Sequence, residues 1–347
     1  MRTEQNAPLL ELDGIVKHFH IRAGANRAAG LLRAVDGVSL TLAAGETLGV
    51  VGESGCGKST LARLMVGLLE PGAGTVRING GDLWEAGAAG RARRRHCQMV
   101  FQNPAGSMNP RRTVGASVAE PLWARGIRDT DAEVARWLNL VGLSGKMAQR
   151  MPHQMSGGQQ QRASIARALI AKPALVVHDE AVASLDISLQ AQILNLLVEL
   201  QERLGTSYVF ISHDLAAVQA ISHRVVVMYL GEIVEVATAQ TFAQRPQHPY
   251  SIALRNATLL PDPVLERMRP ALVLRGDVPS PINPPSGCRF RTRCPLAEAR
   301  CAAEAPALRD AGGGHRVACH FPDAAERLAR SEAHASQAFA SARAPAC

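Results

Sequence analysis

The chain has 347 residues, of which 47% are hydrophobic and 20% are charged, and this ordinary globular composition excludes a chain that is disordered throughout. Its length fits one large α/β domain with an appendage, or two modest domains. The formal net charge of +8 keeps nucleic acid, nucleotide phosphates and anionic lipid headgroups open as partners. No apolar stretch approaches the ~18 residues of a membrane span, and the N-terminus lacks the apolar core of a secretory signal, so we expect a cytoplasmic protein.

The first part of the chain reads as strands followed by a helix. Residues 8–51 predict short strands with a turn-rich insertion at 20–30. The run 47–51 is short, rich in β-branched residues and followed by a glycine, which is typical of a buried parallel strand. Residues 58–69 have a helical period, and Pro71-Gly72 ends that helix.

Strands and helices then alternate up to about residue 245, which predicts a mostly parallel sheet. The expected strands are 75–78, 98–101, 175–177, 208–211 and 224–228. The expected helices are 130–142, 156–171, 187–204 and 214–222. From residue 246 prolines follow one another closely and a cysteine cluster comes next, so we expect a separate C-terminal appendage at 246–322. A tail at 323–347, rich in Ala, Ser and Arg, predicts a fraying helix.

The strongest motif is the phosphate loop, residues 52–59, which matches G-x-x-x-x-G-K-[ST] between a predicted strand and a predicted helix. Its glycines let successive backbone N–H groups point at phosphate oxygens, and the helix N-terminus adds partial positive charge. We expect Lys58 to reach the β- and γ-phosphates of ATP and the Ser59 hydroxyl to bind Mg²⁺. The expected ATP-binding residues here are Gly52, Glu53, Ser54, Gly55, Cys56, Gly57, Lys58, Ser59 and Thr60.

An acidic pair follows the apolar run 175–177. Asp179 at the end of this strand is expected in the Mg²⁺ shell, and Glu180 is expected to orient and deprotonate the attacking water. His178 precedes this pair and would either perturb the magnesium site or fill space in the core.

The stretch Met155-Ser156-Gly157-Gly158-Gln159 resembles the Leu-Ser-Gly-Gly-Gln signature of ABC ATPases. Serine and two glycines at a helix start make a second anion cradle. The resemblance implies a P-loop NTPase with a mostly parallel RecA-like sheet, an N-terminal antiparallel β subdomain and a helical insert at about 104–165. It also implies that two ATPase domains sandwich ATP head to tail, so that the signature residues Ser156, Gly157, Gly158 and Gln159 face the ATP of a partner subunit.

Further landmarks of that family occur in the same order. Gln102 matches the glutamine that touches Mg²⁺ and the permease. Asp186, after Ser184-Leu185, matches the D-loop, and His213 matches the switch histidine that contacts the γ-phosphate. Phe19 lies where family members place an aromatic ring on adenine. The resemblance therefore implies that Glu180, His213 and Gln102 are catalytic, with Mg²⁺ held by Ser59, Gln102 and Asp179.

The resemblance is closest to the ATPases of oligopeptide and dipeptide importers, and to the second of their two ATPase subunits. It rests on the stretches 100–104, 107–111, 190–197, 247–250 and 287–319. It implies an ATPase domain at 8–245 that powers peptide import from the cytoplasmic face of the inner membrane. The implied partners are two permease subunits, a second ABC ATPase in a heterodimer and, indirectly, an extracytoplasmic solute-binding protein.

Alternatives remain for the coupling and the solute. A soluble ABC ATPase that acts on ribosomes or DNA usually has two ATPase domains or a long coiled coil, and an exporter would lack the importer-like tail. Nickel, glutathione or another solute could replace peptides. Basic runs at 91–95 and 111–112 come with only 4% aromatic residues, so stacking platforms for nucleic acid are missing and no nucleic-acid partner is expected.

Four cysteines cluster in the appendage, spaced C-x5-C-x6-C-x17-C, which is not a standard zinc pattern. The importer resemblance implies a [4Fe–4S] cluster on four thiolates. Zinc, with His315 or His320, and unliganded thiols are the alternatives. The cysteines concerned are Cys288, Cys294, Cys301 and Cys319.

Overall fold

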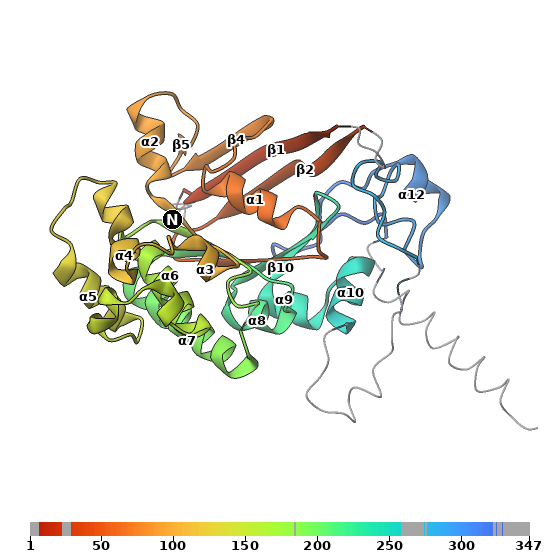
Figure 1. The fold of residues 1–347 in the computed structure, drawn as a ribbon. Coiled ribbons are helices and arrows are strands. Elements are labelled where there is room, and N and C mark those ends of the chain that lie inside the picture. Colours follow the sequence, from red (N-terminus) through yellow and green to blue (C-terminus); the bar gives the residue numbers. More distant parts are fainter. Residues whose placement is uncertain are drawn as a thin grey trace, which may run out of the picture. The chain divides into compact units, whose positions relative to one another are not determined.

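The computed structural model describes residues 7–22, 29–183, 185–257, 274, 276–321, 324 and 328 (Figure 1). Ser184 and nearly all of the predicted tail helix lie outside these residues. The chain divides into two compact units. The first unit comprises Met1–Lys17, Val35–Val51 and Lys58–His223. The second unit comprises His18–Ala34, Gly52–Gly57 and Arg224–Cys347.

The core of the first unit is a parallel sheet. Its strands lie in the order β3 (Thr47–Val51), β8 (Ser207–Ile211), β7 (Leu175–Asp179) and β6 (Cys97–Val100), and each neighbouring pair is parallel. Every residue of β3, β7 and β8 is buried, as strands covered on both faces must be. The predicted parallel pairing is confirmed for these four strands. The expected strands 75–78 and 224–228 instead have antiparallel partners.

The strand register aligns the carboxyl ends of three strands. Val100 of β6 pairs with His178 of β7, which pairs with Phe210 of β8, and Asp179 pairs with Ile211. The chain leaves all three strands at one edge, where ligands bind in open α/β sheets. Gln102, Glu180 and His213 follow these strands within two residues, so this register brings them to the same edge.

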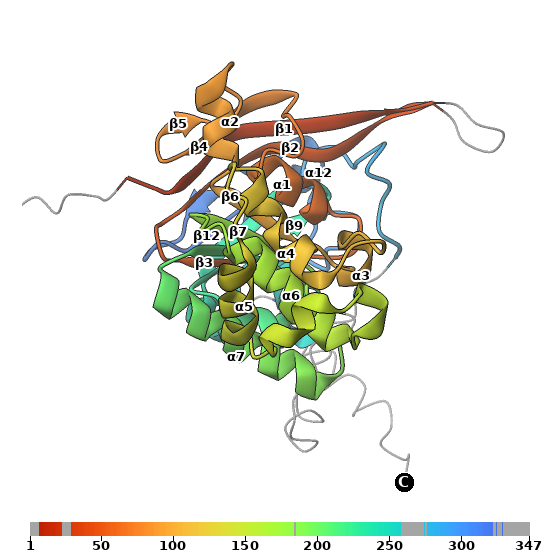
Figure 2. The ribbon, with the colours of Figure 1, turned by 60° about the vertical axis from the view of Figure 1, so that its left-hand side comes forward.

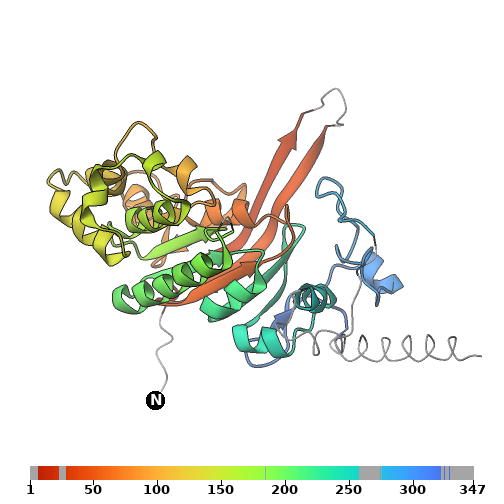
Figure 3. The same ribbon diagram turned by 60° about the horizontal axis from the view of Figure 1, so that its bottom comes forward.

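Helices of the first unit pack on the sheet and form a separate cluster. On the sheet pack α1 (Lys58–Met65) and α8 (Leu215–Ile221), and α7 (Ile187–Leu204) packs against α8. The cluster contains α3 (Pro104–Ser107), α4 (Val114–Trp123), α5 (Asp131–Leu140), the 3₁₀ turns Gly145–Gln149 and Pro152–Gln154, and α6 (Gly157–Leu169). Figures 2 and 3 show α4, α5 and α6 gathered together, which confirms the predicted helical insert.

Three helices of this unit, α2 (Ala88–Arg94), α3 and α4, lie outside the helix ranges expected from local sequence. Helix α4 contains Pro121, and an internal proline argues against a helix when the sequence is read locally. Helix α2 is formed by the basic run and ends in three arginines. Helix α1 ends at Met65 rather than at 69.

An antiparallel sheet, also predicted, has the order β2 (Gly30–Leu42), β1 (Leu10–Ile21), β4 (Ala73–Ile78) and β5 (Gly81–Asp82). Strand β1 continues to Ile21, so it includes the first two residues of the expected turn-rich insertion.

The second unit contains an antiparallel sheet in the order β9 (Arg224–Tyr229), β10 (Glu232–Thr238), β12 (Arg316–Val317) and β11 (Arg309–Asp310). Its helices are α9 (Ala239–Gln244), α10 (Pro249–Asn256) and α12 (Ala299–Ala303). The carboxylate of Glu235, which is fully buried, accepts the N–H groups of Gln247 and His248 and contacts His315 Nε2 at 2.7 Å. This buried group ties the start of α10 to the loop before β12.

Candidate functional site

A hydroxyl and a carboxylate meet where α1 begins. The Ser59 hydroxyl donates to Asp179 Oδ1 at 3.0 Å, and Asp179 is buried at the end of β7. Burial raises the pKa of Asp179, and the hydrogen bond from Ser59 opposes that shift. Hydroxyl and carboxylate oxygens are the ligands that Mg²⁺ prefers in proteins. These two predicted magnesium ligands therefore fit the ion by chemistry and by mutual distance.

Glu180 lies at the centre of three predicted catalytic residues. Gln102 Nε2 donates to Glu180 Oε2 at 2.8 Å, and His213 Nδ1 lies 3.9 Å from the same oxygen. The Glu180 backbone has a φ of +50°, a left-handed conformation that non-glycine residues rarely adopt and that concentrates at functional sites. The structure brings Gln102, Glu180 and His213 together, and their expected catalytic roles stay predictions.

The first six residues of the phosphate loop belong to the second unit. Gly57 has a φ of +105°, and a Cβ there would lie 2.0 Å from the Ala34 carbonyl oxygen. Gly52 is equally constrained, because a Cβ would lie 2.3 Å from Met228 O. The glycines of the motif are therefore required by close backbone approach as well as by φ.

The loop also has partners that sequence reasoning missed. Tyr250 and Arg293 both bind Glu53, the second residue of the motif. They lie 197 and 240 residues away from it in the chain, so no local pattern could have signalled these contacts.

The signature stretch begins α6 as predicted. The Ser156 hydroxyl accepts the N–H of Gln159 at 3.3 Å, and the Gln159 side chain returns a bond to the Ser156 N–H at 3.1 Å, which forms a capping box. A Cβ on Gly157 would meet no atom within 4 Å, whereas one on Gly158 would lie 2.5 Å from Leu189 Cδ2. Gly157 therefore borders open space, and Gly158 packs against α7.

The D-loop residue Asp186 caps α7. Its carboxylate accepts from the Ser188 hydroxyl at 2.7 Å and from the Leu189 N–H at 2.9 Å, and these bonds lower the pKa of Asp186. Phe19 is half-buried in β1. The expected roles of both residues stay predictions.

His178 fills space in the core. It is fully buried in β7, packs edge-on against the ring of Tyr208 with centroids 4.9 Å apart, and has no hydrogen-bond partner for either ring nitrogen among the described residues. Burial lowers the pKa of His178 to about 3. A neutral imidazole in this position supplies no charge to the neighbouring Asp179.

The four clustered cysteines are neighbours. Burial raises the pKa of Cys288 to about 11 and of Cys294 to about 12, and negative charge on the other thiols of the cluster adds to both shifts. Within the described residues, however, no three His, Cys, Asp or Glu side chains are arranged to hold a metal ion. His315 pairs with Glu235, and His320 contacts the Glu304 carbonyl. The thiols nevertheless lie close enough together to raise one another's pKa values.

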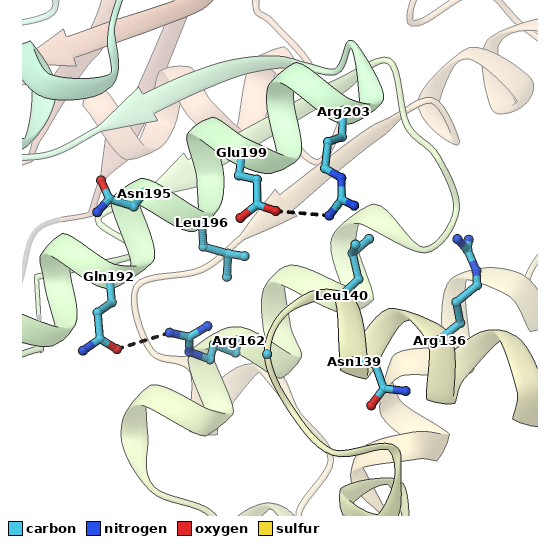
Figure 4. A pocket seen from close by; sticks show the side chains of 10 residues that line it. Arg136, Asn139, Leu140, Arg162, Gln192, Asn195, Leu196, Glu199 and Arg203 are labelled. Atoms are coloured by element: carbon cyan, nitrogen blue, oxygen red, sulfur yellow. Dashed lines mark hydrogen bonds and ion pairs between the residues drawn. The ribbon is translucent and has the colours of Figure 1, made fainter.

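A cleft of about 680 Å³ opens between α5, α6 and α7 (Figure 4). Its arginines are engaged by neighbours: Arg162 bonds Gln192 at 3.3 Å and Val141 O at 2.8 Å, and Arg203 pairs with Glu199 at 3.1 Å. Arg136 pairs with Glu133. Each guanidinium in this cleft therefore has a partner among the described residues.

Two segments of the chain match known families. Residues 35–183 match the family described as "ABC transporter". Residues 234–301 match the family described as "Oligopeptide/dipeptide transporter, C-terminal region".

Relatives match nearly the whole chain. A probable peptide ABC transporter ATP-binding protein from Sinorhizobium fredii is 50% identical, with 93% of each chain covered. An oligopeptide transport ATP-binding protein, OppF, from Salmonella typhimurium is 48% identical over 91% of this chain and 97% of its own. AppF, an oligopeptide transport ATP-binding protein from Bacillus subtilis, is 44% identical over 92% of this chain and 99% of its own.

A solved structure shares the fold. The ATP-binding cassette MJ0796, solved as a dimer in a post-hydrolysis state with ADP and Pi, is 27% identical with a TM-score of 0.58, and covers 66% of this chain and 98% of its own. Together with the relatives, this match makes the chain an ABC-class ATPase. It belongs to the family of ABC transporter ATP-binding proteins that carry the oligopeptide/dipeptide transporter C-terminal region.

Proposed function

We propose that this chain binds and hydrolyses ATP to power the import of oligopeptides or dipeptides through separate membrane permease subunits. The observation that carries the proposal is the contact of Glu180 with Gln102 and His213, beside the Ser59–Asp179 pair. It occurs in a chain whose relatives are named oligopeptide transport ATP-binding proteins. Those relatives do not favour a soluble ABC ATPase as the alternative.

Each residue of this group has a proposed role. Glu180 accepts the proton of the attacking water, and Gln102 and His213 orient its carboxylate. Lys58 and the backbone of the phosphate loop bind the phosphates. Ser59, Asp179 and Gln102 would hold Mg²⁺, which when bound offsets the charge of the phosphates.

A second ATPase chain completes the arrangement in this proposal. Gly157 borders open space at the start of α6, where a helix N-terminus attracts an anion. The signature residues would bind the nucleotide of the partner, and Asp186 would lie at that interface. Because the chain carries a single phosphate loop, the partner is another chain, for which we propose a related ATPase.

The permease has a proposed docking groove. A groove of about 490 Å³ beside β6 is lined by Leu68, Met99, Phe101, Pro121 and Arg167, among others, and Leu68 is 60% exposed. A permease loop seated there would lie one residue from Gln102. No helix in the described ranges is long and apolar enough to cross a membrane, so we propose peripheral attachment at the cytoplasmic face of the inner membrane.

Affinity purification from native membranes in detergent tests the proposal. Two permease subunits and a second ABC ATPase should co-purify, with the extracytoplasmic solute-binding protein identifying the solute. Lys58→Ala should keep these partners while losing ATP binding. Co-purifying ribosomal proteins, with no membrane protein, would overturn the transport function.

The [4Fe–4S] cluster is proposed on the resemblance and on the convergence of the four thiols. Bound metal requires deprotonated thiols, and a cation would remove the mutual repulsion that now helps to raise their pKa values. Protein purified without oxygen should carry iron and sulfide and should be brown, and Cys294→Ala should lose both. Wild-type protein without iron would contradict the cluster. Metal analysis would then show whether the cysteines bind zinc or are free thiols.

A further inference from the structure

The C-terminal cysteine segment, residues 287–301, holds the phosphate loop directly. Arg293, next to Cys294, donates two parallel hydrogen bonds to Glu53, from Nη1 to Oε2 at 2.7 Å and from Nη2 to Oε1 at 3.1 Å. The Arg293 side chain is 9% exposed. A paired guanidinium and carboxylate of this geometry is strong and directional, so the Glu53 side chain is held in one orientation.

The backbone of Glu53 is held as well. Its N–H donates to the hydroxyl of Tyr250 at 2.8 Å. The Tyr250 ring is fully buried and packs against Tyr229 and Phe290, with centroids 4.8 and 5.5 Å apart. Phe290 lies between Cys288 and Cys294 in the chain, so the cysteine segment supplies part of the rigid surface that positions the hydroxyl.

A second connection reaches the other end of the loop. Arg289 donates to the Leu230 carbonyl and pairs with Glu232 at 2.9 Å, which holds the turn between β9 and β10. In that turn the Gly231 N–H donates to the Cys56 carbonyl at 2.9 Å. The cysteine segment therefore supports the loop near residue 53 and near residue 56.

The ion pair between Arg293 and Glu53 changes the net charge of the phosphate loop. A phosphate loop binds an anion through its N–H groups, and the Glu53 carboxylate puts a negative charge within that loop. Burial lowers the pKa of Arg293, but its two hydrogen bonds to the Glu53 carboxylate help to raise that pKa above its usual value. Arg293 therefore stays charged, and it offsets the carboxylate that would otherwise repel the nucleotide.

We propose that Arg293 and Tyr250 are positioning residues of the ATP site, through which the C-terminal cysteine segment sets the affinity for nucleotide. This inference rests on the proposed function, because it assumes that the phosphate loop binds ATP.

A charge-relief experiment tests it on the full chain. The affinity for Mg-ATP would be measured by titration with a fluorescent ATP analogue and competition with ATP, and folding by thermal unfolding. Arg293→Met should raise the Kd about tenfold, because the Glu53 carboxylate keeps its negative charge but loses the positive charge of Arg293. The Kd of Arg293→Lys should lie between those of the wild type and Arg293→Met, since lysine keeps the positive charge but cannot make the two parallel hydrogen bonds. The double variant Arg293→Met/Glu53→Gln should recover most of the affinity.

The recovery separates positioning from damage to the fold, since a second substitution in a merely destabilised protein would not restore binding. Tyr250→Phe, which removes only the hydroxyl that accepts the Glu53 N–H, should raise the Kd about threefold with only a small fall in melting temperature. It provides the test if Arg293→Met fails to fold. Arg300→Met, which removes an exposed pair with Glu304 in the same segment, is the matched control.

An unchanged Kd in both Arg293→Met and Tyr250→Phe would overturn the inference, and so would a double variant no better than Arg293→Met. The proposed function would survive either result, since the wild-type chain would still bind ATP. Wild-type protein that binds no ATP would instead overturn the proposed function and this inference with it.

Discussion

At the scale of single residues, Glu180 depends on neighbours from two other strands. Its N–H donates to the Ile211 carbonyl at 2.9 Å, and its carboxylate contacts Gln102 and His213. The acidic pair after a strand is visible in the sequence, and the family resemblance implies the role that we propose for it. The left-handed backbone is not, because only the packing of β7 beside β8 enforces it.

Replacing Glu180 by glutamine should stop hydrolysis and leave ATP binding intact. The amide keeps the shape and a hydrogen-bonding oxygen but cannot accept a proton, so turnover should fall about 100-fold or more. Phosphate release and nucleotide affinity would be measured in parallel, with the exposed Glu202→Gln as the matched control. Turnover of the Glu180→Gln complex at the wild-type rate would contradict the assignment of the base.

His178 should make the fold sensitive to acid. Its pKa is about 3 in the folded chain and about 6.5 when unfolded. Below about pH 6.5 the unfolded state binds a proton that the folded state excludes, so stability present at neutral pH is lost as the pH falls toward 3. The loss approaches about 1.4 kcal/mol per pH unit.

The variant His178→Leu should therefore flatten the pH dependence of unfolding between pH 6 and pH 4, as measured by urea denaturation. His248 contributes in the same direction, because burial lowers its pKa to about 4, so some slope remains. The exposed His153→Gln should keep the wild-type slope. Equal slopes for His178→Leu and the wild type would show that His178 is not the sensitive group.

At the scale of elements, helix starts follow from local sequence and helix packing does not. Ser156, Asp186 and Asp214 each cap the helix that the sequence predicts there, because a cap needs only a side-chain oxygen and the next N–H groups. Helix α4 is missed because Pro121 opposes it locally, while packing against α5 and α6 favours it. Tertiary contacts override propensity in such segments.

The start of α6 offers a test of the signature stretch. Gly157→Ala adds a methyl group where the chain has no atom within 4 Å, so the melting temperature of the isolated chain should not fall. If this position faces the nucleotide of a partner, ATPase activity of the assembled complex should fall at least about tenfold, since the methyl group keeps phosphate from the N–H groups. Gly158→Ala, which meets Leu189, should lower stability as well. Unchanged activity in the Gly157→Ala complex would place the partner's nucleotide elsewhere.

At the scale of the whole molecule, the family follows from motifs in order along the chain, and it is confirmed by relatives that match 90% or more of it. The domain boundary at residue 245 stays a prediction. The two compact units interleave along the sequence, because residues 52–57 group with 224–347. A division based on where prolines and cysteines begin cannot anticipate that grouping.

The sequence by itself determined the phosphate loop, the helix starts, the buried strands and the family, since these depend on neighbouring residues and on the order of motifs. Tertiary structure alone decided that His178 is neutral core, that Gln102 holds Glu180, and that Arg293 holds Glu53 from 240 residues away. Burial and long-range pairing arise only when distant segments pack together. They set the charge of an ionisable group. The sequence therefore shows where the candidate site lies, but not the protonation states and long-range contacts of its residues.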